Sequence, residues 1–93
     1  MKVETFDNVW DAIEPNLAKR ENLKLRSVLM LEITRYIRRE GLTQAQAAKL
    51  LGVTQPRISN LMHGKINSFG LDLLVRMATA AGLRVSMSVK KAA

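Results

Sequence analysis

Apolar residues recur at helical spacing through most of the chain, and they alternate with polar residues only near its end. Residues 16–40 contain no glycine or proline and consist largely of good helix formers. Their broad apolar face is made by Leu25, Val28, Leu29, Leu31, Ile33, Tyr36 and Ile37. The pattern therefore predicts one long helix that ends at Gly41.

The stretch from Thr43 to Gly64 predicts two short helices joined by a tight turn. Thr43 and Thr54 are good N-cap residues for the two helices, and Pro56 lies in the first turn of the second, where its missing N–H costs nothing. Gly52 stands between the helices, where a left-handed backbone conformation is usual. Apolar residues on both helices then allow them to pack together.

Polar side chains remain at the start of the second helix. A short helix with an apolar underside and with amide and guanidinium groups at its start is suited to reading the major groove. Gln55 can bond to adenine and Arg57 to guanine, while Asn60 is either a third base reader or a phosphate ligand. Further candidates for phosphate contacts, which position a protein without specifying a base, are Thr43, Thr54, Ser59 and Lys65. The alternative is an ordinary helical hairpin.

The same stretch resembles the helix-turn-helix of the Cro and lambda-repressor-like (XRE) family. The resemblance runs without gaps and is carried by Gln44, Ala48, Gly52, Val53, Ile58 and Leu61. In that order, it implies a phosphate-contacting glutamine, a small residue at the helix crossing, the turn glycine and three buried apolar positions. It also aligns Gln55 and Asn60 with base-reading glutamines of the family. Pro56 stands where some members have a second reading glutamine, so the base sequence that is read must differ.

A further helix is predicted between Gly70 and Gly82, after which the period changes. From here apolar residues alternate with polar ones, which is typical of a strand with one solvent-exposed face. The apolar positions are Leu83, Val85, Met87 and Val89. A lone strand leaves backbone groups unpaired, so its partner is either residues 3–6 or the same strand of a second copy. We favour the second copy, because an antiparallel pair of identical strands is self-complementary across a two-fold axis. Such a dimer would place two recognition helices roughly 34 Å apart, one turn of DNA.

The first 21 residues form an acidic leader with a short amphipathic helix of its own, which Asp7 can cap. Its apolar stripe at helical spacing consists of Phe6, Val9, Trp10 and Ile13. We interpret this stripe as packing onto the rest of the domain. The alternative is that the leader binds a basic partner protein.

Charge is distributed unevenly along the chain, whose formal net charge is +7. Residues 1–22 hold three basic and five acidic side chains, whereas the remainder holds twelve basic and three acidic ones. A basic body suits a polyanionic partner, since each neutralised phosphate releases counterions.

Several classes of function are excluded or disfavoured by composition. Without cysteine there is no disulfide framework, thiolate metal site or thiol nucleophile. No metal-ligand set, glycine-rich phosphate loop or catalytic pair is found, so we expect no enzyme, metal or cofactor. No segment of membrane length and no signal peptide is present, which favours a cytoplasmic protein that does not contact membranes.

From about residue 22 onward the chain is similar to a subgroup of XRE proteins, many of them HigA-like antitoxins. The resemblance implies a mainly α, lambda-repressor-like bundle of about five helices with one C-terminal β-strand paired across a homodimer. The corresponding regions are the leader (1–21), the DNA-binding domain (22–82) and the dimerisation strand and tail (83–93). It further implies a repressor of its own operon, acting on a palindromic site in double-stranded DNA, and an antitoxin that binds a RelE-like ribonuclease. A stand-alone regulator and a non-specific DNA-coating protein are the alternatives.

Overall fold

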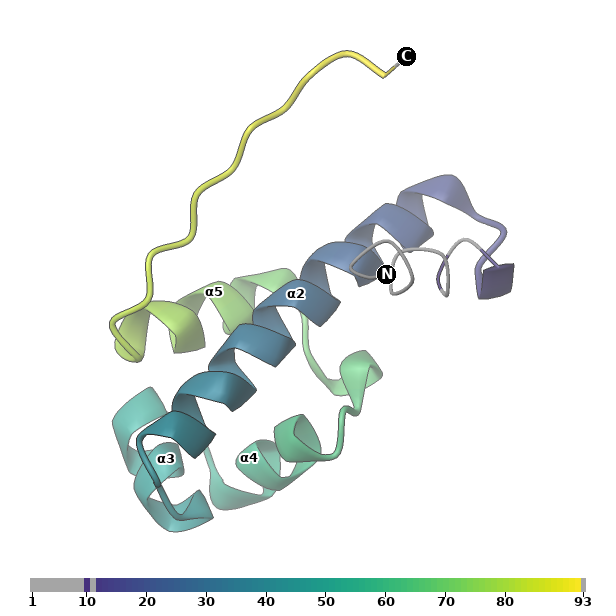
Figure 1. Ribbon diagram of the computed structural model, residues 1–93. Helices are drawn as coiled ribbons and strands as arrows, with labels where there is room; N and C mark the ends of the chain where they lie inside the picture. The colour runs from purple at the N-terminus through teal and green to yellow at the C-terminus, as the bar shows by residue number, and fades with distance from the viewer. Residues whose placement is uncertain (1–9, 11, 93) are drawn as a thin grey trace.

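The computed structural model describes residue 10 and residues 12–92, and most of this part of the chain is helical (Figure 1). Its elements are α2 (Leu17–Arg39), α3 (Gln44–Leu51), α4 (Gln55–Met62), the short 3-10 helix η1 (Ile66–Ser68) and α5 (Leu71–Ala80). Trp10, Ala12 and Ile13 are also helical, but most of the predicted leader helix lies outside the described residues. Within the described part, the structure therefore has four α-helices rather than about five.

The bounds of α2 follow from residues at its two ends. The side chain of Asn16 caps the helix by accepting a hydrogen bond from the N–H of Lys19 at 2.8 Å. Pro15 precedes this cap, so its ring does not interrupt the helix. At the other end Gly41 adopts a φ of 64°, which lets the chain turn sharply towards α3.

The broad apolar face predicted for α2 is divided into two stripes in the structure. The inner stripe is buried and consists of Leu23, Ser27, Met30, Ile33 and Ile37. Leu25, Val28 and Leu31, which also belong to the predicted apolar face, are about half exposed and form an outer stripe. They are exposed because the other described helices cover only one side of α2.

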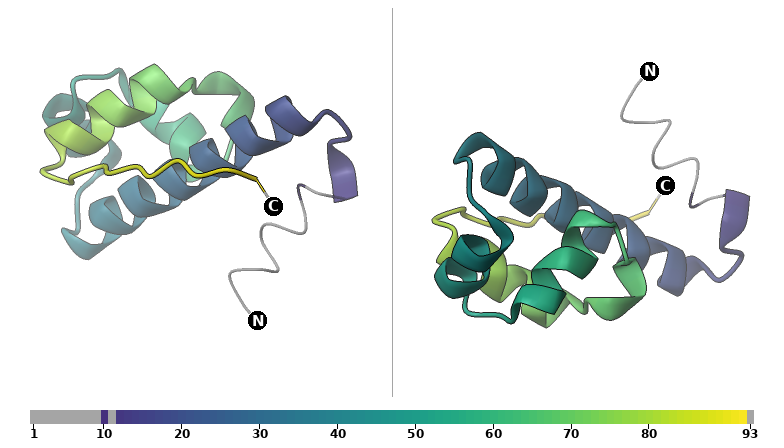
Figure 2. Two further views of the ribbon diagram at one scale, coloured as in Figure 1. Left: turned by 90° about the horizontal axis from the view of Figure 1, so that it is seen from above. Right: turned by 90° about the horizontal axis from the view of Figure 1, so that it is seen from below.

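One hydrophobic core lies between α2 and the remaining helices. Figure 1 and Figure 2 show α3, α4 and α5 gathered on one side of the long helix. The largest fully buried side chains are Phe69, Ile33, Ile58, Leu61, Leu74 and Met77. They come from α2, α4, α5 and the residue after η1, so the core holds the two short helices α3 and α4 against a rigid support.

Residues 83–92 form an extended segment, here called the tail, which runs back along α2 (Figure 1 and Figure 2). It carries no strand pairing within the described part of the chain, so the predicted C-terminal strand is not formed there. A strand is defined by a ladder with a neighbour, and a single copy offers none to residues 83–89 among the described residues. The alternative partner, residues 3–6, lies outside those residues.

Among the described helices, none combines the length and the apolar character needed to cross a membrane.

Candidate nucleic-acid interface

The turn between α3 and α4 is made by Gly52, which adopts a left-handed conformation with a φ of 71°. The N–H groups of Gly52 and Val53 both bond to the carbonyl oxygen of Ala48, which closes the C-terminal end of α3. Ala48 lies 7 % exposed at the contact between the helices, and Ile58 and Leu61 are buried below α4. Val53 is half-buried against the same core. Of the six residues that carry the family resemblance, Ala48, Ile58 and Leu61 are thus buried and Val53 is half-buried, whereas Gly52 in the turn and Gln44 at the start of α3 are exposed.

The start of α3 is fixed by a reciprocal pair of hydrogen bonds. The hydroxyl of Thr43 accepts from the N–H of Gln46 at 3.1 Å, and the side-chain oxygen of Gln46 accepts from the N–H of Thr43 at 2.8 Å. Such a capping box satisfies two helix-end donors at once. It leaves Gln44, in the first turn, exposed and pointing away from the core.

Thr54 caps α4 in a similar way, because its hydroxyl accepts from the N–H of Arg57 at 3.3 Å. Pro56 lies in the first turn of this helix, where no partner for an N–H is needed. In this cap the hydroxyl oxygen of Thr54 acts only as an acceptor. Since Thr54 is exposed, its O–H group can still donate to a phosphate.

Replacing Thr54 with alanine is expected to lower the free energy of unfolding by about 1 kcal/mol, since the cap bond is lost. Thr54→Ser keeps the hydroxyl and should recover most of that stability. Urea denaturation followed by circular dichroism measures both variants. Equal destabilisation by alanine and serine would show that the cap bond is not the source.

The predicted base-reading residues differ in how free their side chains are. Gln55 is exposed, and no hydrogen bond to its side chain is found among the described residues. Asn60 is half-buried one turn later on α4, and its side chain likewise has no hydrogen bond there. Both amides are therefore available for contacts outside the chain.

Arg57 instead has contacts within the protein. Its Nη1 donates to the carbonyl oxygen of Ser68 at 2.8 Å, and the guanidinium lies 5.7 Å from the centre of the Phe69 ring. The bond to Ser68 uses one of the five N–H donors that an arginine carries. Arg57 thus connects the start of α4 to the segment that follows η1.

A second arginine, which the sequence pattern does not single out, holds the same segment from the other side. Nη1 of Arg26, on α2, donates to the carbonyl oxygens of Ile66 and Phe69, each at 3.2 Å. The partners lie 40 and 43 positions away in sequence, so no local pattern could reveal the contact. Together the two arginines hold the connection between α4 and α5 and so orient α4.

The C-terminal end of α4 contains the only histidine of the chain. Nδ1 of His63 donates to the carbonyl oxygen of Ser59 at 2.7 Å and lies 3.5 Å from the Ser59 hydroxyl. His63 therefore acts as a turn residue at the helix end. Ser59, a predicted phosphate ligand, is half-buried with its hydroxyl near this ring, whereas Lys65 is exposed.

The helix-turn-helix is free of acidic side chains. Between Glu40 and Asp72 the sequence contains no aspartate or glutamate, but it contains Lys49, Arg57 and Lys65. Within the described residues none of these three forms an ion pair, while Arg35 and Arg39 on α2 pair with Glu32 and Glu40. The surface around α3 and α4 is therefore positive and suited to a phosphate backbone.

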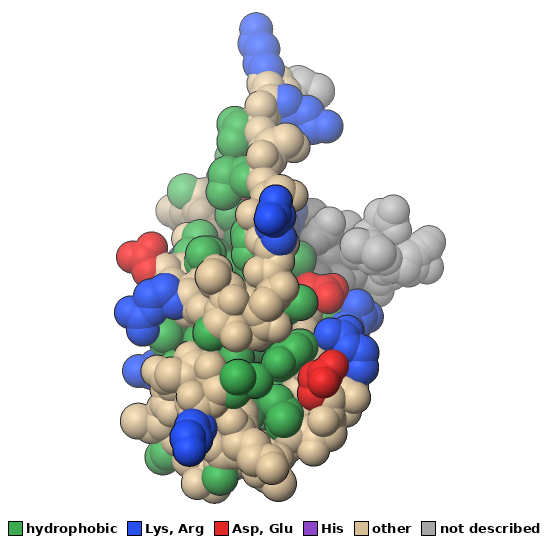
Figure 3. All heavy atoms as spheres, turned by 90° about the vertical axis from the view of Figure 1, so that its left-hand side faces the viewer, with side chains coloured by type: hydrophobic (Ala, Val, Ile, Leu, Met, Phe, Trp, Pro, Cys, Tyr) green, Lys and Arg blue, Asp and Glu red, His purple; other side chains and the backbone are tan. Residues whose placement is uncertain are grey.

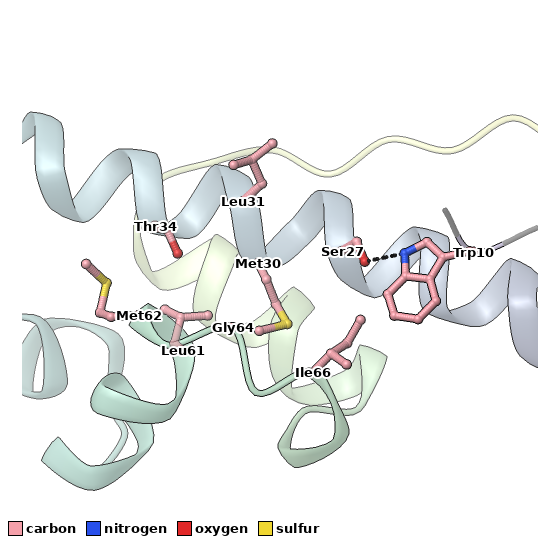
Figure 4. A pocket seen from close by; sticks show the side chains of 9 residues that line it. All are labelled: Trp10, Ser27, Met30, Leu31, Thr34, Leu61, Met62, Gly64 and Ile66. Carbon is pink, nitrogen blue, oxygen red and sulfur yellow. Dashed lines mark hydrogen bonds between the residues drawn. The ribbon is translucent and has the colours of Figure 1, made fainter. Parts of the chain in front are cut away.

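The leader meets the body of the protein through Trp10. Its indole Nε1 donates to the hydroxyl of Ser27 at 3.0 Å, and the ring borders a hollow of about 310 Å³ between α2 and the end of α4 (Figure 4). Ile13 is 61 % exposed, and Phe6 and Val9 lie outside the described residues. Trp10 thus contacts the domain, while the rest of the predicted leader stripe is either exposed or not described. No cluster of three or more metal-ligating side chains is found in the described part of the chain.

A family of helix-turn-helix domains matches residues 13–90, well over half of the chain, and the protein belongs to this family. The match covers α2 to α5 and most of the tail. The class is that of DNA-binding regulators, which is consistent with an XRE-like domain. Comparison with curated proteins finds no match.

Proposed function

We propose that this protein is a sequence-specific transcriptional repressor that binds a palindromic operator as a homodimer. The observation that carries the proposal is the start of α4, where Gln55 projects from a capped and supported helix on a surface without acidic residues. A helix in this position can enter the major groove, where a glutamine amide bonds to adenine at two atoms. The protein acts by binding and not by catalysis.

Roles at the interface follow from exposure and contacts. Gln55 and Asn60 read bases, because their amides have no partner within the described residues. Gln44 and Lys65 contact phosphates on either side, since both are exposed on the positive surface. Thr43, Thr54 and Ser59 add phosphate contacts close to helix ends, where backbone N–H groups also favour anions.

Two variants should separate base reading from phosphate contact. Gln55→Ala is expected to cost about 1–3 kcal/mol on the operator and to relax specificity at one base pair. Gln44→Ala should weaken binding to the operator and to random DNA by similar factors, because phosphates carry no sequence information. Asn22→Ala, at an exposed position near the start of α2, is the matched control and should bind like the natural protein.

Footprinting on the DNA upstream of the gene, followed by titration of every single-base variant of the protected site, provides the measurement. A protected inverted repeat would support a dimer that represses its own operon. Uniform protection with little competition by specific DNA would contradict the proposal and favour a non-specific coating protein, since specific binders are typically about 10³–10⁷-fold tighter on their own site.

We further propose that the repressor is a HigA-like antitoxin of a type II toxin–antitoxin pair, with a RelE-like ribonuclease as its partner. The uneven charge supports this role, because residues 1–22 are acidic overall and provide a surface unlike the basic body. A small basic open reading frame beside the gene, and co-purification of its product, are the expected results. A complex that forms equally well without residues 1–22 would exclude the leader as the binding segment. A gene with no such neighbour would favour a stand-alone regulator.

A further inference from the structure

Part of the outer stripe of α2 continues onto α5 and the tail as one apolar surface. Leu25 and Val28 of α2 and Val75 of α5 are between 39 and 51 % exposed. They line a groove of about 370 Å³ that α2, α5 and the tail enclose on three sides, whereas Leu31 lines the separate hollow beside Trp10. Figure 3 shows hydrophobic side chains that follow one side of the tail and continue onto the body of the protein. Such a surface is larger than scattered apolar residues would produce.

The tail covers this groove incompletely. The exposed fraction of the apolar side chains rises along the tail, from 42 % at Val85 to 74 % at Met87 and 87 % at Val89. The helices of the same chain therefore shield only the beginning of the tail. Leu83 donates its N–H to the carbonyl oxygen of Ala78, but residues 84–92 form no further backbone hydrogen bond within the described part of the chain. The tail therefore has both an uncovered apolar side and an unpaired backbone edge.

We propose that the tail of a second copy closes this groove, so that two antiparallel tails lie with their apolar sides against α2 and α5 of both protomers. This inference rests on the proposed homodimer and adds the helix surface to its interface. A second copy fits better than an unrelated partner because each chain supplies what the other lacks. One chain contains both an open groove and a strand-like segment that has no paired strand among the described residues, which is the self-complementarity that a two-fold interface requires.

The charged side chains of the groove and the tail also favour a second copy of the chain as the occupant. Asp72 lines the groove and forms no ion pair within the described residues. Glu32 lines a neighbouring hollow and is paired with Arg35 at 3.2 Å. The polar side of the tail carries Arg84 and Lys90. A tail arriving from a second copy therefore brings positive side chains near the carboxylate of Asp72, whereas an acidic partner would add negative charge there.

The test compares the association of three variants by sedimentation velocity over a range of concentrations. Val28→Glu places a charge in the groove, and Met87→Glu places one on the tail, outside the folded core. Each should weaken self-association at least about a hundredfold, because a charge buried without a partner costs several kcal/mol. Leu50→Glu is the matched control: Leu50 is 46 % exposed on α3, away from the groove, and this variant should associate like the natural protein. Circular dichroism shows that each variant remains folded.

The outcomes separate this inference from the proposed function. Dimers that persist in both Val28→Glu and Met87→Glu would overturn the inference and leave the dimeric repressor intact. Equal weakening by Leu50→Glu would also overturn it, since the groove would then have no special role. A natural protein that is monomeric and protects a single half-site would contradict the proposed homodimer itself.

Discussion

Replacing Phe69 with alanine should lower the free energy of unfolding by about 3–5 kcal/mol. The side chain is 1 % exposed and is one of the six largest that are fully buried. It belongs to the hydrophobic core cluster, and the guanidinium of Arg57 lies 5.7 Å from the centre of its ring. Removing the ring leaves a cavity in a small core. A domain of this size is typically stable by only about 5–15 kcal/mol, so much of the protein's stability would be lost.

Urea denaturation followed by circular dichroism measures this effect. Leu50→Ala provides the control, because Leu50 is nearly half exposed and its truncation should change stability by less than about 1 kcal/mol. The Phe69 variant should also bind DNA more weakly whatever the sequence, since α4 loses its support. If Phe69→Ala lowered the free energy of unfolding by less than about 1 kcal/mol, neighbouring residues would have moved to fill the cavity left by the ring.

Arg57→Ala should have two separable effects, on stability and on DNA recognition. In the absence of DNA, loss of the charged hydrogen bond to Ser68 should cost about 1.5–3 kcal/mol of stability. On the operator, loss of a guanidinium contact should cost about 1–3 kcal/mol and relax specificity at one base pair. The two effects are measured by denaturation and by titration of single-base variants of the operator.

Arg57→Met is the informative companion variant, because it retains aliphatic packing against Phe69 without the donors. If Arg57 reads a base, the alanine and methionine variants should relax specificity at the same base pair of the operator and to the same extent. Equal losses of affinity on operator and random DNA would instead mean that Arg57 only positions α4. In that case the contact with Ser68 would be its whole contribution, and Gln55 and Asn60 would carry the specificity.

Features that depend on local chemistry could be predicted from the sequence. The bounds of α3 and the roles of Thr43, Gly52 and Thr54 were all accessible because caps and turns involve residues within four positions of each other. The position of Gln55 at the exposed start of α4 follows from the same signals. This local information defines most of the helix-turn-helix.

Features that depend on distant residues could not be predicted. In the sequence the outer stripe of α2 cannot be told apart from the buried inner stripe. Apolar periodicity shows which residues share a face of a helix, but not which faces other helices will cover. The contacts of Arg26 and Arg57 with the segment around η1 join residues that share no local pattern. The tail has the alternation of a strand, but whether it forms one depends on a partner outside the described chain.

The contact between Trp10 and Ser27 gives the protein an intrinsic spectroscopic reporter. Trp10 is the only tryptophan in the chain, and its indole lies where the acidic leader meets α2, away from Gln55 and the start of α4. Fluorescence emission therefore originates at the junction with the leader and not at the DNA-reading surface. Events at the two ends of the domain can be followed in one sample, with the indole reporting on the leader and labelled DNA reporting on α4.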